Sequence, residues 1–105
     1  MKKGTRPQSL QAMRERRKQI DLIDQKLLSL LNQRLSIALK IGKIKKERRE
    51  KIYNPKREGE IVKRLNLKNR GPLKKEDLKK IFKKIMMVCR KSQIQRHADP
   101  QKGSL

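Results

Sequence analysis

The stretch between Pro7 and Pro55 contains no proline, and its apolar residues recur at helical spacing. The recurring positions are Leu10, Met13, Ile20, Ile23, Leu27, Leu31, Ala38 and Ile41. This pattern predicts one very long helix from about Ser9 to Arg48, roughly 60 Å at 1.5 Å per residue. A compact domain of 105 residues has a radius of gyration of about 13 Å, so this helix would extend well beyond it. A second copy of the chain is the simplest cover for the apolar stripe.

Three cations interrupt this stripe. Arg34 and Lys45 fall at the centre of the apolar face and Arg17 at its edge. A permanent cation in a packed seam is costly unless an anion or a hydrogen-bond network meets it. The three cations therefore suggest a cavity for a small ligand that carries more than one negative charge.

The spacing of the cations indicates how such a cavity is built. Arg34 and Lys45 are about three helical turns apart, roughly 16 Å, so their long side chains can hold one ligand between them. Arg17 lies roughly 25 Å before Arg34 and is too far away to reach the same molecule. An antiparallel pair of long helices would instead bring Arg17 of one chain to the Arg34–Lys45 pocket of the other.

Two further helices are expected. The second begins at Asn54-Pro55, an N-cap residue followed by proline at the first helical position, and ends before Gly71-Pro72. The third spans about Lys74 to Gln95. The expected inward residues are Ile61, Val62 and Leu65 on the second helix, and Leu78, Ile81, Phe82, Ile85 and Cys89 on the third.

Polar residues also stand on the apolar faces of these two helices. Glu58 lies at the centre of the second helix's face, Arg57 at its edge, and Gln93 continues the third helix's stripe. Taken singly, they could be a carboxylate paired with a lysine, a solvated flank and a fraying helix end. Together with Arg34 and Lys45 they indicate a binding site.

Composition limits the class of protein. Thirty-two lysines and arginines against ten acidic residues give a net charge of +22, which by itself favours a nucleic-acid partner. Tyr53 and Phe82 are the only aromatic residues, which argues against a base-stacking platform, and no nucleic-acid-binding motif is present. His97 lies in a polar tail and Gly42 stands alone, so neither a metal site nor a glycine-rich phosphate loop is expected.

The domain organisation follows from the same patterns. We expect one domain over residues 9–95, a disordered basic tail at Met1–Gln8, and a disordered tail or linker at Arg96–Leu105. One cysteine, no apolar run of membrane-spanning length and no signal-peptide core predict a soluble cytoplasmic protein without disulfides.

The chain resembles a known family in four segments. RKQIDLIDQKLLSLLNQRLSIALKIGKIK (Arg17–Lys45) and IYNPKREGEIVKRL (Ile52–Leu65) are similar to the all-helical (type II) class of chorismate mutases. The similarity continues through NRGPL (Asn69–Leu73) and IFKKIMMVCRKSQ (Ile81–Gln93). The resemblance implies an all-α homodimer of three-helix protomers, interlocked through the long first helix, with two equivalent active sites and no cofactor or metal.

The resemblance also implies an activity, the rearrangement of chorismate to prephenate in phenylalanine and tyrosine biosynthesis. The residues that it places at the site are Arg34, Lys45, Arg57, Glu58 and Gln93, with Arg17 from the partner chain. Two substrate-binding positions depart from the family pattern: Asn54 stands where aspartate is frequent, and Cys89 where serine is frequent.

Roles follow from the chemistry of a rearranging dianion. Arg17, Arg34 and Arg57 are expected to bind the carboxylates, because the planar guanidinium matches a carboxylate with two hydrogen bonds. Lys45 and Gln93 would donate to the ether oxygen. Glu58 would accept from the ring hydroxyl and orient Lys45. The alternatives are an isochorismate-pyruvate lyase, which uses the same scaffold, and a basic helical nucleic-acid-binding protein.

Overall fold

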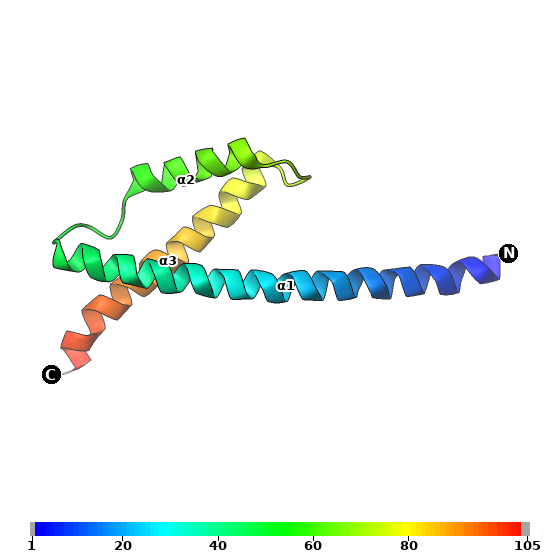
Figure 1. Cartoon of the computed structure of the whole chain (residues 1–105), viewed down its shortest axis with the longest axis horizontal. Helices are drawn as coiled ribbons and strands as arrows, with labels where there is room; N and C mark the ends of the chain where they lie inside the picture. The colour runs from blue at the N-terminus through cyan, green and yellow to red at the C-terminus, as the bar shows by residue number, and fades with distance from the viewer. Residues whose placement is uncertain (1, 104–105) are drawn as a thin grey trace. The chain divides into compact units, whose positions relative to one another are not determined.

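The chain forms three α-helices in a computed structural model: α1 (Lys2–Glu47), α2 (Pro55–Lys68) and α3 (Lys75–Gly103) (Figure 1). The structure describes residues 2–103, with side chains from Gln8 to Arg96. These residues include no strand, so the predicted all-α class with three helices is confirmed. No helix in this part of the chain is both long and apolar enough to cross a membrane.

The helix ends differ from those predicted. The structure starts α1 before Ser9, continuing it through Pro7, and extends α3 beyond Gln95. Local boundary signals such as proline locate helix ends only approximately. The disorder predicted for Met1–Gln8 and Arg96–Leu105 stays a prediction, because nearly all of these side chains, and residues 1, 104 and 105 entirely, lie outside the described residues.

The chain divides into two compact units, the first ending at Arg34 and the second beginning at Leu35. The first unit is the N-terminal part of α1. Its apolar stripe is exposed to solvent along its length, as the side chains of Leu10, Met13, Ile20, Ile23 and Leu27 show. The described residues of this unit therefore leave the stripe uncovered.

The second unit begins with the last turns of α1, and the helix is followed by Arg49, a residue in the left-handed conformation. Arg49 has a φ of 58°, and its amide donates to the Lys46 carbonyl at 3.1 Å. The next amide, of Glu50, reaches back to the Lys45 carbonyl at 2.8 Å. This pair of bonds is the Schellman motif, which satisfies the last carbonyls of a helix and turns the chain away.

Helix α2 starts where the sequence predicts. The Asn54 side chain accepts a hydrogen bond from the amide of Arg57 at 3.0 Å, and Pro55 occupies the first helical position. Proline costs nothing there because the first amides of a helix have no partner within it. After α2, the Asn69 side chain holds the turn through the Leu73 carbonyl at 2.7 Å and the Gly71 amide at 3.1 Å.

Helix α3 packs against α2, and the second unit has a small core. Its buried side chains are Ala38, Leu78, Met86, Cys89 and Gln93. The predicted face of α3 is wrong at one edge: Ile81 is 47% exposed, whereas Met86 is 4% exposed. Apolar spacing alone leaves the centre of a helical face uncertain when apolar residues are adjacent, as Ile85 and Met86 are.

Replacing Arg49 by glycine should raise the free energy of unfolding by about 1 kcal/mol, because glycine adopts a left-handed conformation without the steric cost of a Cβ. Denaturant unfolding followed by helical circular dichroism, at one protein concentration, measures the change. Arg64→Gly is the control at an exposed position inside α2 and should lower stability by about 1 kcal/mol. A loss in both variants would contradict the left-handed turn.

Candidate active site

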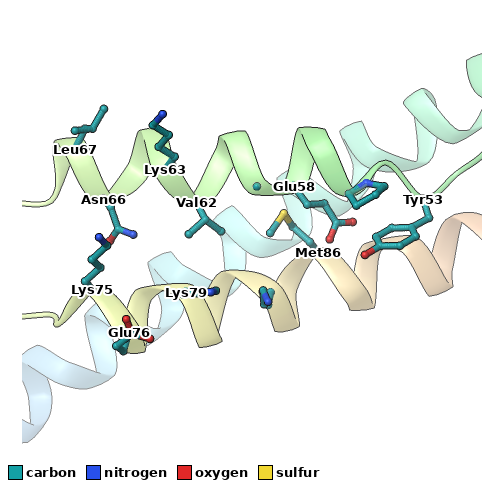
Figure 2. A pocket seen from close by; sticks show the side chains of 13 residues that line it. Tyr53, Glu58, Val62, Lys63, Asn66, Leu67, Lys75, Glu76, Lys79 and Met86 are labelled. Carbon is teal, nitrogen blue, oxygen red and sulfur yellow. The ribbon is translucent and has the colours of Figure 1, made fainter.

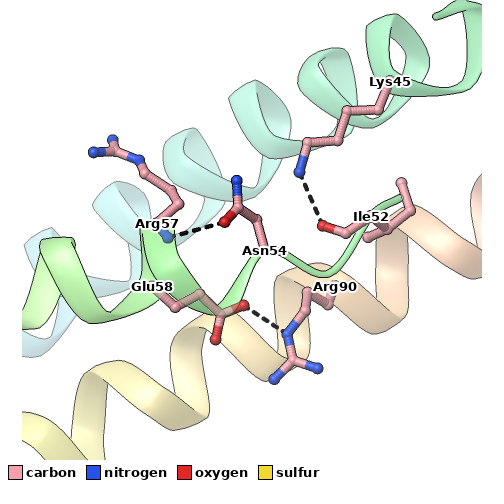
Figure 3. A network of polar contacts seen from close by, with 6 residues as sticks. All are labelled: Lys45, Ile52, Asn54, Arg57, Glu58 and Arg90. Atoms are coloured by element: carbon pink, nitrogen blue, oxygen red, sulfur yellow. Dashed lines mark hydrogen bonds and ion pairs between the residues drawn. The ribbon is translucent and has the colours of Figure 1, made fainter. Parts of the chain in front are cut away.

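Lys45, in the last turn of α1, is held by the main chain that follows it. Its ammonium nitrogen donates to the carbonyl oxygen of Ile52 at 2.9 Å (Figure 3). The contact is partly buried and spans the connection between α1 and α2. An ammonium group has three N–H donors, so the bond fixes the direction of the side chain and leaves two donors for a ligand.

Glu58, in the first turn of α2, forms an ion pair across to α3. Its Oε2 atom lies 2.7 Å from Nε of Arg90 (Figure 3). The same guanidinium lies over the ring of Tyr53, 4.3 Å from its centroid. In this structure Glu58 contacts a cation on α3, and Lys45 contacts a backbone carbonyl. The expected orientation of Lys45 by Glu58 stays a prediction.

Gln93 is the one buried polar side chain of the described residues, at 7% exposure. Its amide nitrogen donates to the carbonyl oxygen of Ala38 in α1 at 2.6 Å. Because a carbonyl oxygen only accepts, this contact determines which end of the amide group is nitrogen. One N–H is used on Ala38 and the second can serve another acceptor. Cys89, one turn earlier, is buried on the same side of α3.

The remaining predicted residues are less enclosed. Arg57 and Asn54 are exposed, and the Asn54 side chain is engaged in capping α2. Arg17 and Arg34 belong to the first unit, where Arg17 is exposed and Arg34 half-buried. The other predicted residues all lie in the second unit: Lys45 at the end of α1, Asn54, Arg57 and Glu58 at the start of α2, and Cys89 and Gln93 in the C-terminal half of α3.

An open groove between α2 and α3 extends from Glu58. Figure 2 shows the side chains of Glu58, Val62 and Met86 turned into the space between the two helices. The other residues that line the groove include four lysines, Lys63, Lys75, Lys79 and Lys83. An apolar floor with a cationic rim suits an organic anion or an amphipathic segment of protein.

A model of the family described as "Chorismate mutase type II" matches residues 16–94, and that range contains all of the predicted site residues. The chain belongs to this family. The curated relatives include bifunctional chorismate mutase/prephenate dehydratases. The one from Aquifex aeolicus is 36% identical over 84 residues, 76% of this chain and 23% of that protein. The one from Neisseria gonorrhoeae is 37% identical over 73 residues, 70% of this chain and 20% of that protein.

A solved structure supports the same fold. The chain matches chorismate mutase (form II) from Thermus thermophilus with a TM-score of 0.76 and 31% identity, covering 77% of this chain and 92% of the other. The chain spans less than a quarter of the length of these curated relatives.

The sequence patterns did not indicate the contacts of Arg90 with Glu58 and Tyr53. Arg90 lies four residues after Met86, so both side chains leave the same side of α3. The expected inner face of α3 omits Met86. The sequence pattern therefore gives no reason to separate Arg90 from the many surface cations. The backbone acceptors of Ala38 and Ile52 leave no signal in a sequence, because every residue carries a carbonyl.

Gln93→Glu should destabilise the fold at about pH 7 and much less at about pH 4. At neutral pH the new carboxylate has no proton to donate to the Ala38 carbonyl, and burial raises its pKa above the unfolded value. A raised pKa contributes stability below the unfolded pKa, and that contribution is lost as pH rises through the folded pKa. Thermal unfolding at both pH values measures the effect. Gln95→Glu, exposed on the same helix, is the control, and an equal pH dependence there would contradict the buried contact.

Proposed function

We propose that this chain is a chorismate mutase, which rearranges chorismate to prephenate on the route to phenylalanine and tyrosine. The observation that carries the proposal is the family match over residues 16–94, supported by the Thermus thermophilus neighbour, which is itself named a chorismate mutase. The dehydratase activity in the relatives' names is not proposed, since this chain covers less than a quarter of those proteins. We place the protein in the cytoplasm, because its one cysteine suits a reducing compartment.

The reaction is an intramolecular rearrangement in which an ether C–O bond breaks while a C–C bond forms. It needs neither a nucleophile nor a proton transfer. The enzyme must hold a flexible dianion in a compact conformation and stabilise the negative charge that develops on the ether oxygen. Both tasks depend on fixed cations and hydrogen-bond donors.

We assign the carboxylates of the substrate to arginines. Arg34 and Arg57 of one chain, with Arg17 of its partner, would each offer a planar fork of N–H donors. Asn54 would contribute its backbone N–H, because its side chain already caps α2. Cys89 would add a weak contact in place of a hydroxyl.

The ether oxygen is assigned to Lys45 and Gln93. Each of these side chains donates one N–H to a backbone carbonyl. At least one further N–H on each can donate to the substrate. Donors fixed before the reaction stabilise charge without reorganising during it, and this term is usually the largest in enzymes of this type. Glu58 would accept from the ring hydroxyl, while its Oε2 atom faces Arg90.

We further propose that the active form is a homodimer interlocked through the long helix α1. The exposed apolar stripe of the first unit supports this, because an apolar surface of this length on a single helix is covered in most soluble proteins. In the dimer, Arg17 would complete the active site of the partner chain. The sites would then be composite, with neither chain able to form one alone.

The experiment that tests the function is turnover of chorismate by the purified chain, followed as loss of its ultraviolet absorbance. Prephenate, identified by its acid conversion to phenylpyruvate, supports the proposal. Release of pyruvate from isochorismate would support the lyase instead. Inactivity toward both, with salt-dependent binding to DNA, would support the nucleic-acid alternative.

Lys45→Ala should lower kcat at least about 100-fold, because it removes a fixed charge from the ether oxygen. Steady-state kinetics measure the loss. Lys43→Ala removes the same charge from an exposed position two residues away and controls for the overall positive field. A Lys45→Ala enzyme with nearly normal kcat would remove this residue from the mechanism.

Mixing two inactive variants, Arg17→Ala and Arg34→Ala, should restore activity after subunit exchange. In a hybrid dimer, one site has both arginines and the other has neither. Random exchange makes half of the dimers hybrids, and half of the sites in each are intact, so about a quarter of wild-type activity returns. Either variant exchanged with itself is the control. A mixture as inactive as the controls would place both arginines in the same chain's site.

A further inference from the structure

Arg90 is connected to two residues at the start of α2 and is itself outside the set that the family pattern indicates. Its Nε atom is buried and lies 2.7 Å from the Glu58 carboxylate, as an ion pair whose geometry is not that of a hydrogen bond. Its guanidinium carbon lies 4.3 Å from the centre of the Tyr53 ring. Gln93, the proposed ether-oxygen donor, follows Arg90 within one turn of α3.

These contacts restrict the guanidinium more than an ordinary surface ion pair does. The side chains of Arg90 and Glu58 are 28% and 19% exposed, which reduces screening by solvent and salt. The Tyr53 ring supports one face of the planar group through a cation–π contact. A lysine could supply the charge, but it lacks the planar group that lies over the Tyr53 ring beside Glu58.

The ion pair uses one of the two oxygens of Glu58. With Oε2 facing Arg90 Nε, we assign the hydroxyl donor to Oε1. The ion pair also determines which cation the Glu58 carboxylate contacts. Without Arg90, the carboxylate would be drawn to another cation, and Lys45, held only by a neutral carbonyl, is a candidate on the adjoining segment. Such a pair would occupy the ammonium group that the substrate's ether oxygen needs.

We propose that Arg90, supported by Tyr53, is a positioning residue: it holds the Glu58 carboxylate toward the ring hydroxyl of the substrate and away from Lys45. This inference rests on the proposed function. Arg90 acts through Glu58 and does not itself bind the substrate. Its removal should therefore lower kcat more than it raises KM, and only while Glu58 is present.

A double-mutant cycle with Glu58→Gln tests this role. Arg90→Gln should lower kcat about 10-fold with KM changed less than about twofold, and should have no further effect on kcat in the Glu58→Gln background. Arg90→Lys should recover part of the loss. Lys91→Gln, which removes one positive charge from an exposed neighbour, should leave kcat near wild type.

The other outcomes are distinct from these. Equal losses of kcat from Arg90→Gln in both backgrounds, or a rise in KM in both, would overturn the positioning role and make Arg90 a structural or a substrate-binding residue. If Arg90→Gln does not fold by circular dichroism, Arg90→Lys is carried through the same cycle with the same criteria. A wild-type chain that does not turn over chorismate would overturn the proposed function, and the Arg90 role with it.

Discussion

The buried hydrogen bond from Gln93 to the Ala38 carbonyl sets the register of α3 against the C-terminal part of α1. An amide buried without a partner costs several times what a satisfied one contributes, so any other register that buries this side chain is disfavoured. Met86 and Cys89 precede Gln93 by two turns and one turn, and the same register places them in the core. Arg90 is thereby directed toward Glu58 and α2.

Neutral acceptors hold the two proposed ether-oxygen donors. Lys45 and Gln93 are each oriented by a main-chain carbonyl, which neither cancels the positive charge of Lys45 nor exhausts the N–H donors of either side chain. A carboxylate in either place would compete directly with a dianionic substrate. Glu58, the acidic residue nearest the start of α2, is paired with Arg90 instead. The arrangement keeps positive potential available at the site, in keeping with the chain's large excess of basic residues.

The sequence predicted those features that depend on neighbours along the chain. The Asn54-Pro55 start of α2 is confirmed because an N-cap and a proline act within a single turn. The polar interruptions also identified Gln93 as buried, since a helical stripe continues through it. Partners could not be predicted in this way. Whether Glu58 meets Lys45 or Arg90 depends on how α2 approaches α3, and a spacing pattern within one helix carries no information about that.

The small core connects folding to the proposed assembly. None of the large side chains that the structure describes is fully buried, and the apolar stripe of the N-terminal part of α1 is exposed. A chain of this size with so little buried surface gains little net stability alone, so covering the stripe by a second copy would be part of folding. The face of α1 that carries the apolar stripe also carries Arg17 and Arg34, and a cation is costly to desolvate without an anion. An anionic ligand that neutralises them would stabilise the assembled state, and binding and association would be coupled through Arg17 and Arg34.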